Sequence, residues 1–375
     1  RESGLPHGSH RQGEHGAFRL CPQPQGTLVR DNGADTVIAS NVTITGGLLQ
    51  ISGDDNATLN DGDDVISLTN ITQSGESSIS VAGNGGDDSI AVNTFTQTNG
   101  KMSLNGGAGN NTISVSDATT SDGNLGIYGG ADEDVISINN WKPTGNELFQ
   151  AYGYGGNDSI SAIKIDVYKE FDIYGNNGED TIYVNGGVIE GGLLSIYGGA
   201  DNDSIYALGI INRDGEVGIF GEDGDDTIIA DDFRYAFEGI VKFDGGSGDD
   251  LISIKDIKPQ GSSGSSGNVE QVLSITGGAG NDTISIETIT APVDFNLSAG
   301  NGEDSISFKN LTQESGGKTN IHGEADDDTI SISNATMTGG SLNVYGDSGN
   351  VTISVENVTQ SGGEFAIYGD DGDDS

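Results

Sequence analysis

Carboxylates recur at one fixed position of a short glycine-rich turn through most of this 375-residue chain. The clearest copy is residues 277–282, with the sequence GGAGND, and the strand-like segment 283–286 follows it. Glycine permits positive φ, so the turn can direct backbone carbonyl oxygens toward one point, and the final Asp adds carboxylate oxygens. An all-oxygen ligand set suits a hard cation, and a large, flexible shell favours Ca²⁺ over Mg²⁺. The turn therefore predicts Ca²⁺ binding.

The last position of this turn returns about every 23 residues. Twelve of the fourteen spacings lie between 22 and 24 residues, and the other two are 29 and 32. So regular a period indicates stacked repeats, in which each turn lies above its neighbour and one ion could lie between successive turns. The predicted Ca²⁺ ligands are Asp35, Asp64, Asp88, Asn111, Asp134, Asp158, Asp180, Asp203, Asp226, Asp250, Asp282, Asp304, Asp328 and Asp374.

Two copies of the turn lack Asp at the last position. Asn111 keeps a side-chain oxygen, whereas Val351 offers only its backbone carbonyl, so we expect the lowest Ca²⁺ affinity there. The alternative interpretation is structural, because turns favour Asp, Asn and Gly and because Asp side chains cap their own backbones. Against it, carboxylates stacked ~5 Å apart would repel by about 3 kcal/mol per neighbouring pair at an effective dielectric constant of 20.

The composition is strongly acidic. The formal net charge is −43, from 58 acidic and 15 basic residues, and only 33% of the residues are apolar. This excess disfavours nucleic acids and anionic membrane surfaces as partners. No stretch approaches the roughly 20 apolar residues of a membrane helix, so we expect no membrane insertion. The single Cys21 excludes an intramolecular disulfide framework.

Two parts of the chain are distinguishable. Residues 1–28 share nothing with the repeats, and we expect a disordered leader or linker there; the spacing of His7, His10, His15 and Cys21 fits no zinc template. Residues 29–375 form one continuous repeat domain, which we expect to be truncated within a repeat at its C-terminus.

The apolar residues define the elements that hold the turns. Alternation after the turn places Ile284 and Ile286 on one face, and a second strand supplies another inward pair such as Leu194 and Ile196. A fifth apolar residue, such as Trp141, is expected in a lateral loop. Five inward residues cannot bury themselves in one repeat, so stacking must complete the core. The predicted fold is all-β: a right-handed parallel β-solenoid of about 14 coils, β-roll-like or β-helix-like, with one Gly/Asp turn per coil.

The two long spacings do not require a domain boundary. The 32-residue spacing contains the Gly/Ser-rich segment 259–267, which we assign to a lateral loop. The 29-residue spacing, around residues 53–60, is expected to be a smaller bulge of the same kind.

Segment 277–285 resembles the Gly-Gly-x-Gly-x-Asp-x-apolar-x nonapeptide of the RTX, or hemolysin-type, calcium-binding repeats, and segment 245–253 resembles it equally well. Near matches begin at Gly106, Gly129, Gly198 and Gly221. The resemblance implies that the Asp side chains and turn carbonyls bind Ca²⁺. It departs from the family in spacing, since about 14 residues separate successive nonapeptides here. Only one edge of the solenoid would therefore carry ions.

Three further patterns each allow a functional and a structural interpretation. Outward Ser/Thr rows, such as Thr283 and Ser285, are compatible with ice binding or with an ordinary solvated strand face. An aromatic column could stabilise the stack or bind carbohydrate; it consists of Tyr128, Tyr152, Tyr174, Tyr197 and Phe220. Asn-x-Ser/Thr triplets could be glycosylation acceptors or a hydrogen-bonded ladder; they begin at Asn41, Asn70, Asn310, Asn334 and Asn357.

Charged residues of the less regular coils could belong to a polysaccharide-acting enzyme or to solvated loops; no catalytic signature accompanies them. They are Lys164, Asp166, Lys169, Arg213, Asp214, Asp231, Asp232 and Arg234, with Trp141 nearby.

The sequence as a whole favours a secreted or cell-surface module that binds multiple Ca²⁺ ions and acts as a structural or adhesive rod. Its expected partners are calcium ions, surface polysaccharide, and neighbouring copies or domains of a larger protein. A polysaccharide-cleaving β-helix enzyme or epimerase and an ice-binding solenoid remain the alternatives, and enzymatic activity is the less favoured.

Overall fold

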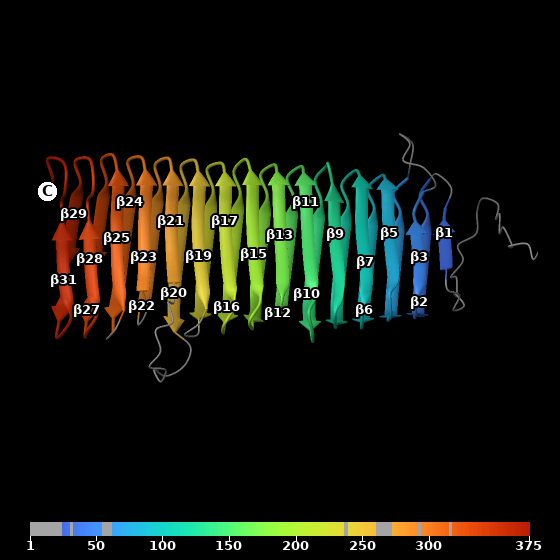
Figure 1. Ribbon diagram of the computed structural model, residues 1–375. Coiled ribbons are helices and arrows are strands. Elements are labelled where there is room, and N and C mark those ends of the chain that lie inside the picture. The colour runs from blue at the N-terminus through green and yellow to red at the C-terminus, as the bar shows by residue number, and fades with distance from the viewer. Residues whose placement is uncertain are drawn as a thin grey trace, which may run out of the picture.

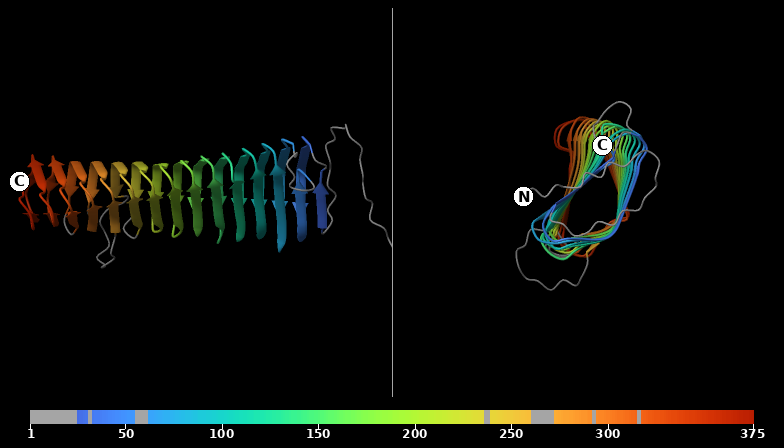
Figure 2. Two further views of the ribbon diagram at one scale, coloured as in Figure 1. Left: turned by 90° about the horizontal axis from the view of Figure 1, so that it is seen from above. Right: turned by 90° about the vertical axis from the view of Figure 1, so that its right-hand side faces the viewer.

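The structure, a computed structural model, describes residues 25–30, 33–54, 62–235, 239–259, 272–291, 294–314 and 317–375. In these ranges every regular element is a β-strand, and none is a helix. The strands lie side by side along a straight rod (Figure 1). The end view in Figure 2 shows the coils superposed on one oval outline. The predicted all-β parallel solenoid of about 14 coils is therefore confirmed.

Two parallel sheets form the long faces of the rod. The first sheet contains β1 (Gln25–Val29), β3 (Gly47–Ser52), β5 (Ser77–Gly85), β7 (Gly100–Ala108), β9 (Gly123–Gly130), β11 (Leu148–Gly155), β13 (Glu170–Asn177), β15 (Leu193–Ala200), β17 (Glu216–Asp223), β19 (Ile240–Ser247), β21 (Val272–Ala279), β23 (Asp294–Asn301), β25 (Lys318–Ala325), β28 (Ser341–Tyr345) and β31 (Glu364–Tyr368).

The second sheet contains β2 (Thr36–Ile44), β4 (Val65–Gln73), β6 (Ser89–Gln97), β8 (Thr112–Thr120), β10 (Val135–Pro143), β12 (Ser159–Val167), β14 (Thr181–Ile189), β16 (Ser204–Asn212), β18 (Thr227–Tyr235), β20 (Leu251–Pro259), β22 (Thr283–Ala291), β24 (Ser305–Gln313), β26 (Thr329–Ser333) and β29 (Thr352–Glu356). The short strands β27 (Thr336–Met337) and β30 (Thr359–Gln360) pair beside it.

One coil consists of a strand from each sheet and two connections. The Gly/Asp turn leads from the first sheet to the second along one side of the rod, which we call the turn edge. The chain returns to the first sheet along the opposite side, the lateral edge. Equivalent residues of successive coils pair in parallel register, as Ile173 does with Ile196 and Ile182 with Ile205. Each turn therefore lies directly beside the next.

The core lies between the two sheets and runs the length of the rod. The alternation predicted from the sequence is observed, because Ile284 and Ile286 are buried, as are Leu194 and Ile196. Burial weakens at the last coil, where Ile367 is 45% exposed because no described coil covers it. The stack, and not the single coil, therefore supplies the burial.

The residues that we assigned to a lateral loop lie within the strands of the second sheet, which is a correction of the prediction. Ile71 belongs to β4 and Trp141 to β10, and both are buried. A residue with positive φ precedes each of them, namely Asn70 (φ 55°) and Asn140 (φ 59°). This left-handed residue bends the strand without ending it, and Asn tolerates that conformation better than most residues do. The bend removes the need for a separate loop.

The two long spacings fall at opposite edges. The 32-residue spacing extends the connection from β20 to β21, at the lateral edge as predicted. The 29-residue spacing extends the connection from β3 to β4, which lies at the turn edge; our assignment of both to the same kind of loop was wrong. The predicted domain boundary after residue 28 falls inside β1, which pairs with β3. Residues 1–24, including His7, His10, His15 and Cys21, lie outside the described residues.

Candidate functional site

The turn has a regular backbone, which we number one to six from its first Gly to its last Asp. Positions two and four take positive φ in most coils, as Gly246 (φ 114°) and Gly248 (φ 129°) do. Where another residue occupies these positions it adopts the same conformation, as Glu222 (φ 80°) and Asp201 (φ 79°) illustrate. Glycine is common here because side chains strain this conformation.

The turn aspartates, at position six, connect successive coils. The backbone N–H of one aspartate donates to Oδ1 of the aspartate in the next coil, for example from Asp134 to Asp158 and from Asp158 to Asp180, both at 2.7 Å. The same bond recurs along the rod from Asp35 to Asp328 at 2.7 to 3.1 Å. Val351 interrupts this ladder because it offers no side-chain oxygen to Asp328. The turn aspartates therefore do cap backbone amides, but those of the preceding coil and not those of their own turn, where the structural interpretation placed them.

The second carboxyl oxygen, Oδ2, is buried and accepts no hydrogen bond in ten of these aspartates. The ten are Asp88, Asp134, Asp158, Asp180, Asp203, Asp226, Asp250, Asp282, Asp304 and Asp328, each at most 3% exposed. The sequence predicted a column of carboxylates along an edge, and the structure places that column inside the wall. A buried, unpartnered carboxylate oxygen is costly unless a proton or a cation accompanies it.

Glycine at position one makes room for this oxygen. A Cβ added to Gly153 would collide with Oδ2 of Asp158 and would lie 2.8 Å from the carbonyl oxygen of Gly175 in the next coil. Oδ2 and a neighbouring carbonyl therefore converge above the glycine, which is the all-oxygen donor set of a hard cation. Ala299 is the exception, because it carries a methyl group at this position beside Asp304.

Asn111 shows what the buried position requires. Its Nδ2 lies 2.6 Å from the Cβ that Gly106 would carry, in the place that Oδ2 takes beside the equivalent glycine of other coils. From there Nδ2 donates to the carbonyl oxygen of Gly109 at 2.8 Å. The asparagine thus presents a donor where aspartate presents an acceptor. With aspartate, a proton or a cation must separate the two oxygens.

Burial raises the pKa of these carboxyls well above their ordinary value. The pKa rises to about 6 for Asp134, Asp226 and Asp304, to about 7 for Asp88, Asp180, Asp250, Asp282 and Asp328, and to about 8 for Asp158 and Asp203. Desolvation is the largest cause, and the backbone N–H on Oδ1 opposes it. Without a cation, the column is therefore only partly ionised near neutral pH.

The remaining predicted ligands lie in different surroundings. Asp64 is buried like the others, whereas Asp35 is half-buried and Asp374 is exposed. Val351 is fully buried and takes the place of a carboxylate with an apolar side chain. The structure therefore places these predicted residues in one column, with exposed carboxylate at its C-terminal end.

A second polar column at position five was missed in the sequence analysis. Its side chains accept from the position-five N–H of the next coil, as Asp225 does from Asp249 at 2.9 Å and Asp249 from Asn281 at 2.7 Å. These side chains are exposed. The same 23-residue period, with Asp, Asn or Glu at every copy after Ala34, would have revealed the column.

The lateral edge carries a neutral counterpart. The buried side chain of Gln73 donates through Nε2 to the carbonyl oxygens of Ser77 and Lys101, both at 3.0 Å. Asn212 likewise donates to Gly215 and accepts from its N–H, each at 3.0 Å. Side-chain amides thus satisfy backbone groups at this edge in these coils, whereas Val167 and Ile189 occupy the position equivalent to Asn212 in two others.

Two of the surface patterns show the contacts that their structural interpretations predict. The rings of Tyr152, Tyr174, Tyr197 and Phe220 stack in register with centroids 4.7 to 5.0 Å apart, so the inner ring faces are covered and unavailable to a sugar. The Asn column forms side-chain hydrogen bonds, as from Asn334 to Asn310 at 3.3 Å.

The lateral charges do not form a recognisable catalytic arrangement in the described residues. Arg213 pairs with Glu190 at 3.1 Å and Arg234 with Asp232 at 3.2 Å, and all four side chains are well exposed. A shallow hollow beside Trp141, Lys169 and Phe171 encloses no space for a water molecule. Glu147 in that hollow is already held, because Oε1 accepts the amides of Thr144 and Gly145.

Comparison with protein-family models, curated proteins and solved structures gave no match for this chain. Among the described residues, no helix is long and apolar enough to cross a membrane.

Proposed function

We propose that this protein is a Ca²⁺-binding structural rod whose turn aspartates take up ions between successive coils. The observation that carries the proposal is the column of ten buried Oδ2 atoms with no hydrogen-bond partner, nine of which lie beside a backbone carbonyl oxygen of the next coil. The residues that would hold the ions are the buried turn aspartates, with carbonyl oxygens of the turns completing the shell. When bound, Ca²⁺ would supply the positive charge that the buried carboxylates lack.

The charge balance supports the same proposal. The chain carries a formal net charge of −43, and the carboxyls of the column lie close enough to raise one another's pKa, as Asp134 and Asp180 do for Asp158. Divalent ions would remove this repulsion and would stabilise the folded chain by binding it in preference to the unfolded chain. The resemblance to RTX repeats points to the same ion, although here one edge alone carries the turns.

A role outside the cytoplasm follows from the ion. Extracellular Ca²⁺ modules bind with dissociation constants on the order of 10⁻⁴–10⁻³ M, a range in which the rod would fold or stiffen only after leaving a low-calcium compartment. We therefore propose a secreted or cell-surface rod that spaces or displays neighbouring domains, as in an adhesin. Surface polysaccharide and further copies of the chain are the partners that this role suggests.

The first test is a Ca²⁺ titration of the EDTA-treated chain followed by far-UV circular dichroism, with Mg²⁺ as the control. We expect a gain of β-structure or of thermal stability with Ca²⁺ alone, and calorimetry should register several ions per chain. A β-spectrum and stability that Ca²⁺ leaves unchanged, with no ion uptake, would reject the proposal.

A matched pair of variants locates the ions. Asp226→Asn with Asp250→Asn removes two buried turn carboxylates, whereas Asp225→Asn with Asp249→Asn removes two exposed ones from the same turns. Both double variants change the net charge equally. We expect fewer bound Ca²⁺ ions in the first and an unchanged number in the second. Fewer bound ions in the second double variant, with an unchanged number in the first, would place the ions on the polar column at position five.

A further inference from the structure

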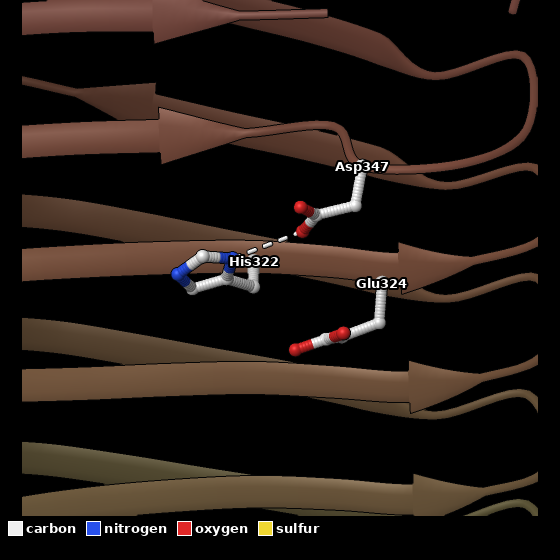
Figure 3. Close-up of side chains that lie close together, drawn as sticks. All are labelled: His322, Glu324 and Asp347. Carbon is white, nitrogen blue, oxygen red and sulfur yellow. Dashed lines mark hydrogen bonds and ion pairs between the residues drawn. The ribbon is translucent and has the colours of Figure 1, made fainter. Parts of the chain in front are cut away.

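A cluster of three metal-ligating side chains lies outside the buried column. His322, Glu324 and Asp347 each direct a ligand atom to one place on the surface, and these atoms lie within 4.8 Å of one another. Figure 3 shows the imidazole beside the two carboxylates, with Nδ1 of His322 3.0 Å from Oδ2 of Asp347. It is the one such group of His, Cys, Asp and Glu side chains that the described residues contain.

The solenoid register assembles this cluster. His322 and Glu324 belong to β25, and Asp347 follows β28 in the next coil. Glu324 (φ 78°) and Asp347 (φ 64°) both occupy turn position two, so the stacking of coils places one carboxylate above the other. His322 pairs with Tyr345 across the sheet, and the rings stack with centroids 4.5 Å apart and planes 8° apart. This contact fixes the imidazole plane.

The combination occurs once because three requirements must coincide. A histidine must stand two residues before position two, and acids must occupy that position in its own coil and in the next. The coil of Phe220 and Glu222 has an acid at position two but a phenyl ring where His322 has an imidazole. The next coil has Gly246 at position two and therefore supplies no second carboxylate. The side chains of His322 and Asp347 are 33% and 30% exposed, so an ion can reach the group from solvent.

We propose that His322, Glu324 and Asp347 bind a divalent transition-metal ion of the Zn²⁺ class. A neutral imidazole with two carboxylates has a charge of about −2, which a divalent cation balances. The nitrogen ligand distinguishes this group from the turns, because Ca²⁺ and Mg²⁺ take oxygen ligands whereas imidazole suits Zn²⁺ and its neighbours. Three protein ligands leave a coordination position open to water, as in exposed zinc sites.

The test uses the full chain with His7, His10 and His15 replaced by Ala and Cys21 by Ser, so that His322 is the only histidine. Zinc chloride is titrated by calorimetry in excess Ca²⁺, which occupies oxygen-only sites. We expect one Zn²⁺ per chain and a shift of the single imidazole signal in the NMR spectrum. No uptake, or uptake without that shift, would overturn the proposal.

Three substitutions in this background sharpen the result. His322→Tyr removes the nitrogen but keeps a ring on Tyr345, as Tyr345 itself stacks on Tyr368. Glu324→Gln removes one carboxylate, and Glu222→Gln is its matched control at the same turn position. We expect loss of the one-site isotherm with His322→Tyr, weakening with Glu324→Gln and no change with Glu222→Gln. An isotherm that survives His322→Tyr, or an equal loss in the control, would overturn the assignment. Circular dichroism verifies that each variant is folded.

Discussion

The two edges of the rod satisfy their backbone groups with different chemistry. At the lateral edge, buried amides such as Gln73 donate to carbonyl oxygens and are neutral. At the turn edge, the carboxylates use Oδ1 as the acceptor for one amide and leave Oδ2 buried without a partner. Asn111 shows that an amide can serve at the turn edge as well. Hydrogen bonding alone therefore does not explain why Asp fills nearly every copy of the turn, whereas the proposed cation would.

The largest expected effect is an opposite pH dependence with and without Ca²⁺. The pKa of the column lies at about 6 to about 8 in the folded chain, above the ordinary 3.8. Between these values the folded chain holds more protons than the unfolded chain. Without Ca²⁺, stability is therefore greatest below about pH 4 and falls as the pH rises through 6 to 8. Because Ca²⁺ requires ionised carboxylates, it should restore stability most near pH 8.

The measurement is the free energy of unfolding in urea, followed by circular dichroism. It is made at about pH 5 and about pH 8, in EDTA and in Ca²⁺. The double variant Asp225→Asn with Asp249→Asn is the control for general charge repulsion. An equal free energy of unfolding in EDTA at both pH values would contradict the pH dependence that distinguishes the turn edge from the lateral edge.

Gln73→Ala tests the lateral edge. It removes the donor from the carbonyl oxygens of Ser77 and Lys101 and leaves a space at a buried position, so we expect a loss of about 1–3 kcal/mol of unfolding free energy. Unlike the effect at the turn edge, this loss should be independent of pH and Ca²⁺. Gln360→Ala at the exposed end of the same column is the control, with a smaller loss. Calcium dependence of the Gln73→Ala defect would show that the edges are coupled.

Asp203→Asn converts one turn to the chemistry of Asn111. In EDTA near pH 8 the amide can donate to the turn carbonyl, so we expect a gain of about 0.5–1.5 kcal/mol in unfolding free energy. In Ca²⁺ the gain should disappear, because one ion site is lost. Chemical denaturation in both conditions measures the difference. A variant less stable than the parent in EDTA would mean that Asp203 stabilises the fold by more than the hydrogen bond that it accepts from the Asp180 amide.

Asp225→Ala has the smallest expected effect. It removes the acceptor of the Asp249 amide, but that amide can turn to water because the position is exposed. We expect a loss below about 1 kcal/mol and an unchanged number of bound Ca²⁺ ions. If calorimetry shows fewer bound Ca²⁺ ions in this variant, the proposed site extends to the polar column at position five.

Much of this architecture could be predicted from the sequence, because a 23-residue period and alternating apolar residues such as Ile284 and Ile286 determine which residues stack. The direction of a side chain at a turn could not be predicted in this way. Periodicity placed the turn aspartates in one column, but their burial depends on a small residue at position one of the same turn, which is glycine in most coils and Ala299 before Asp304. The bend at Asn70 was missed for a related reason, since positive φ inside a strand leaves no change in hydrophobic pattern.

The extended connection between β20 and β21 has a consequence for how such a chain can change. Phe243 still pairs with Ile275, and Ile254 with Ile286, on either side of it. Added residues at the lateral edge therefore do not displace the neighbouring coils. The rod can acquire or exchange surface segments one at a time there, and a foreign peptide grafted between Pro259 and Val272 should be carried without altering the scaffold.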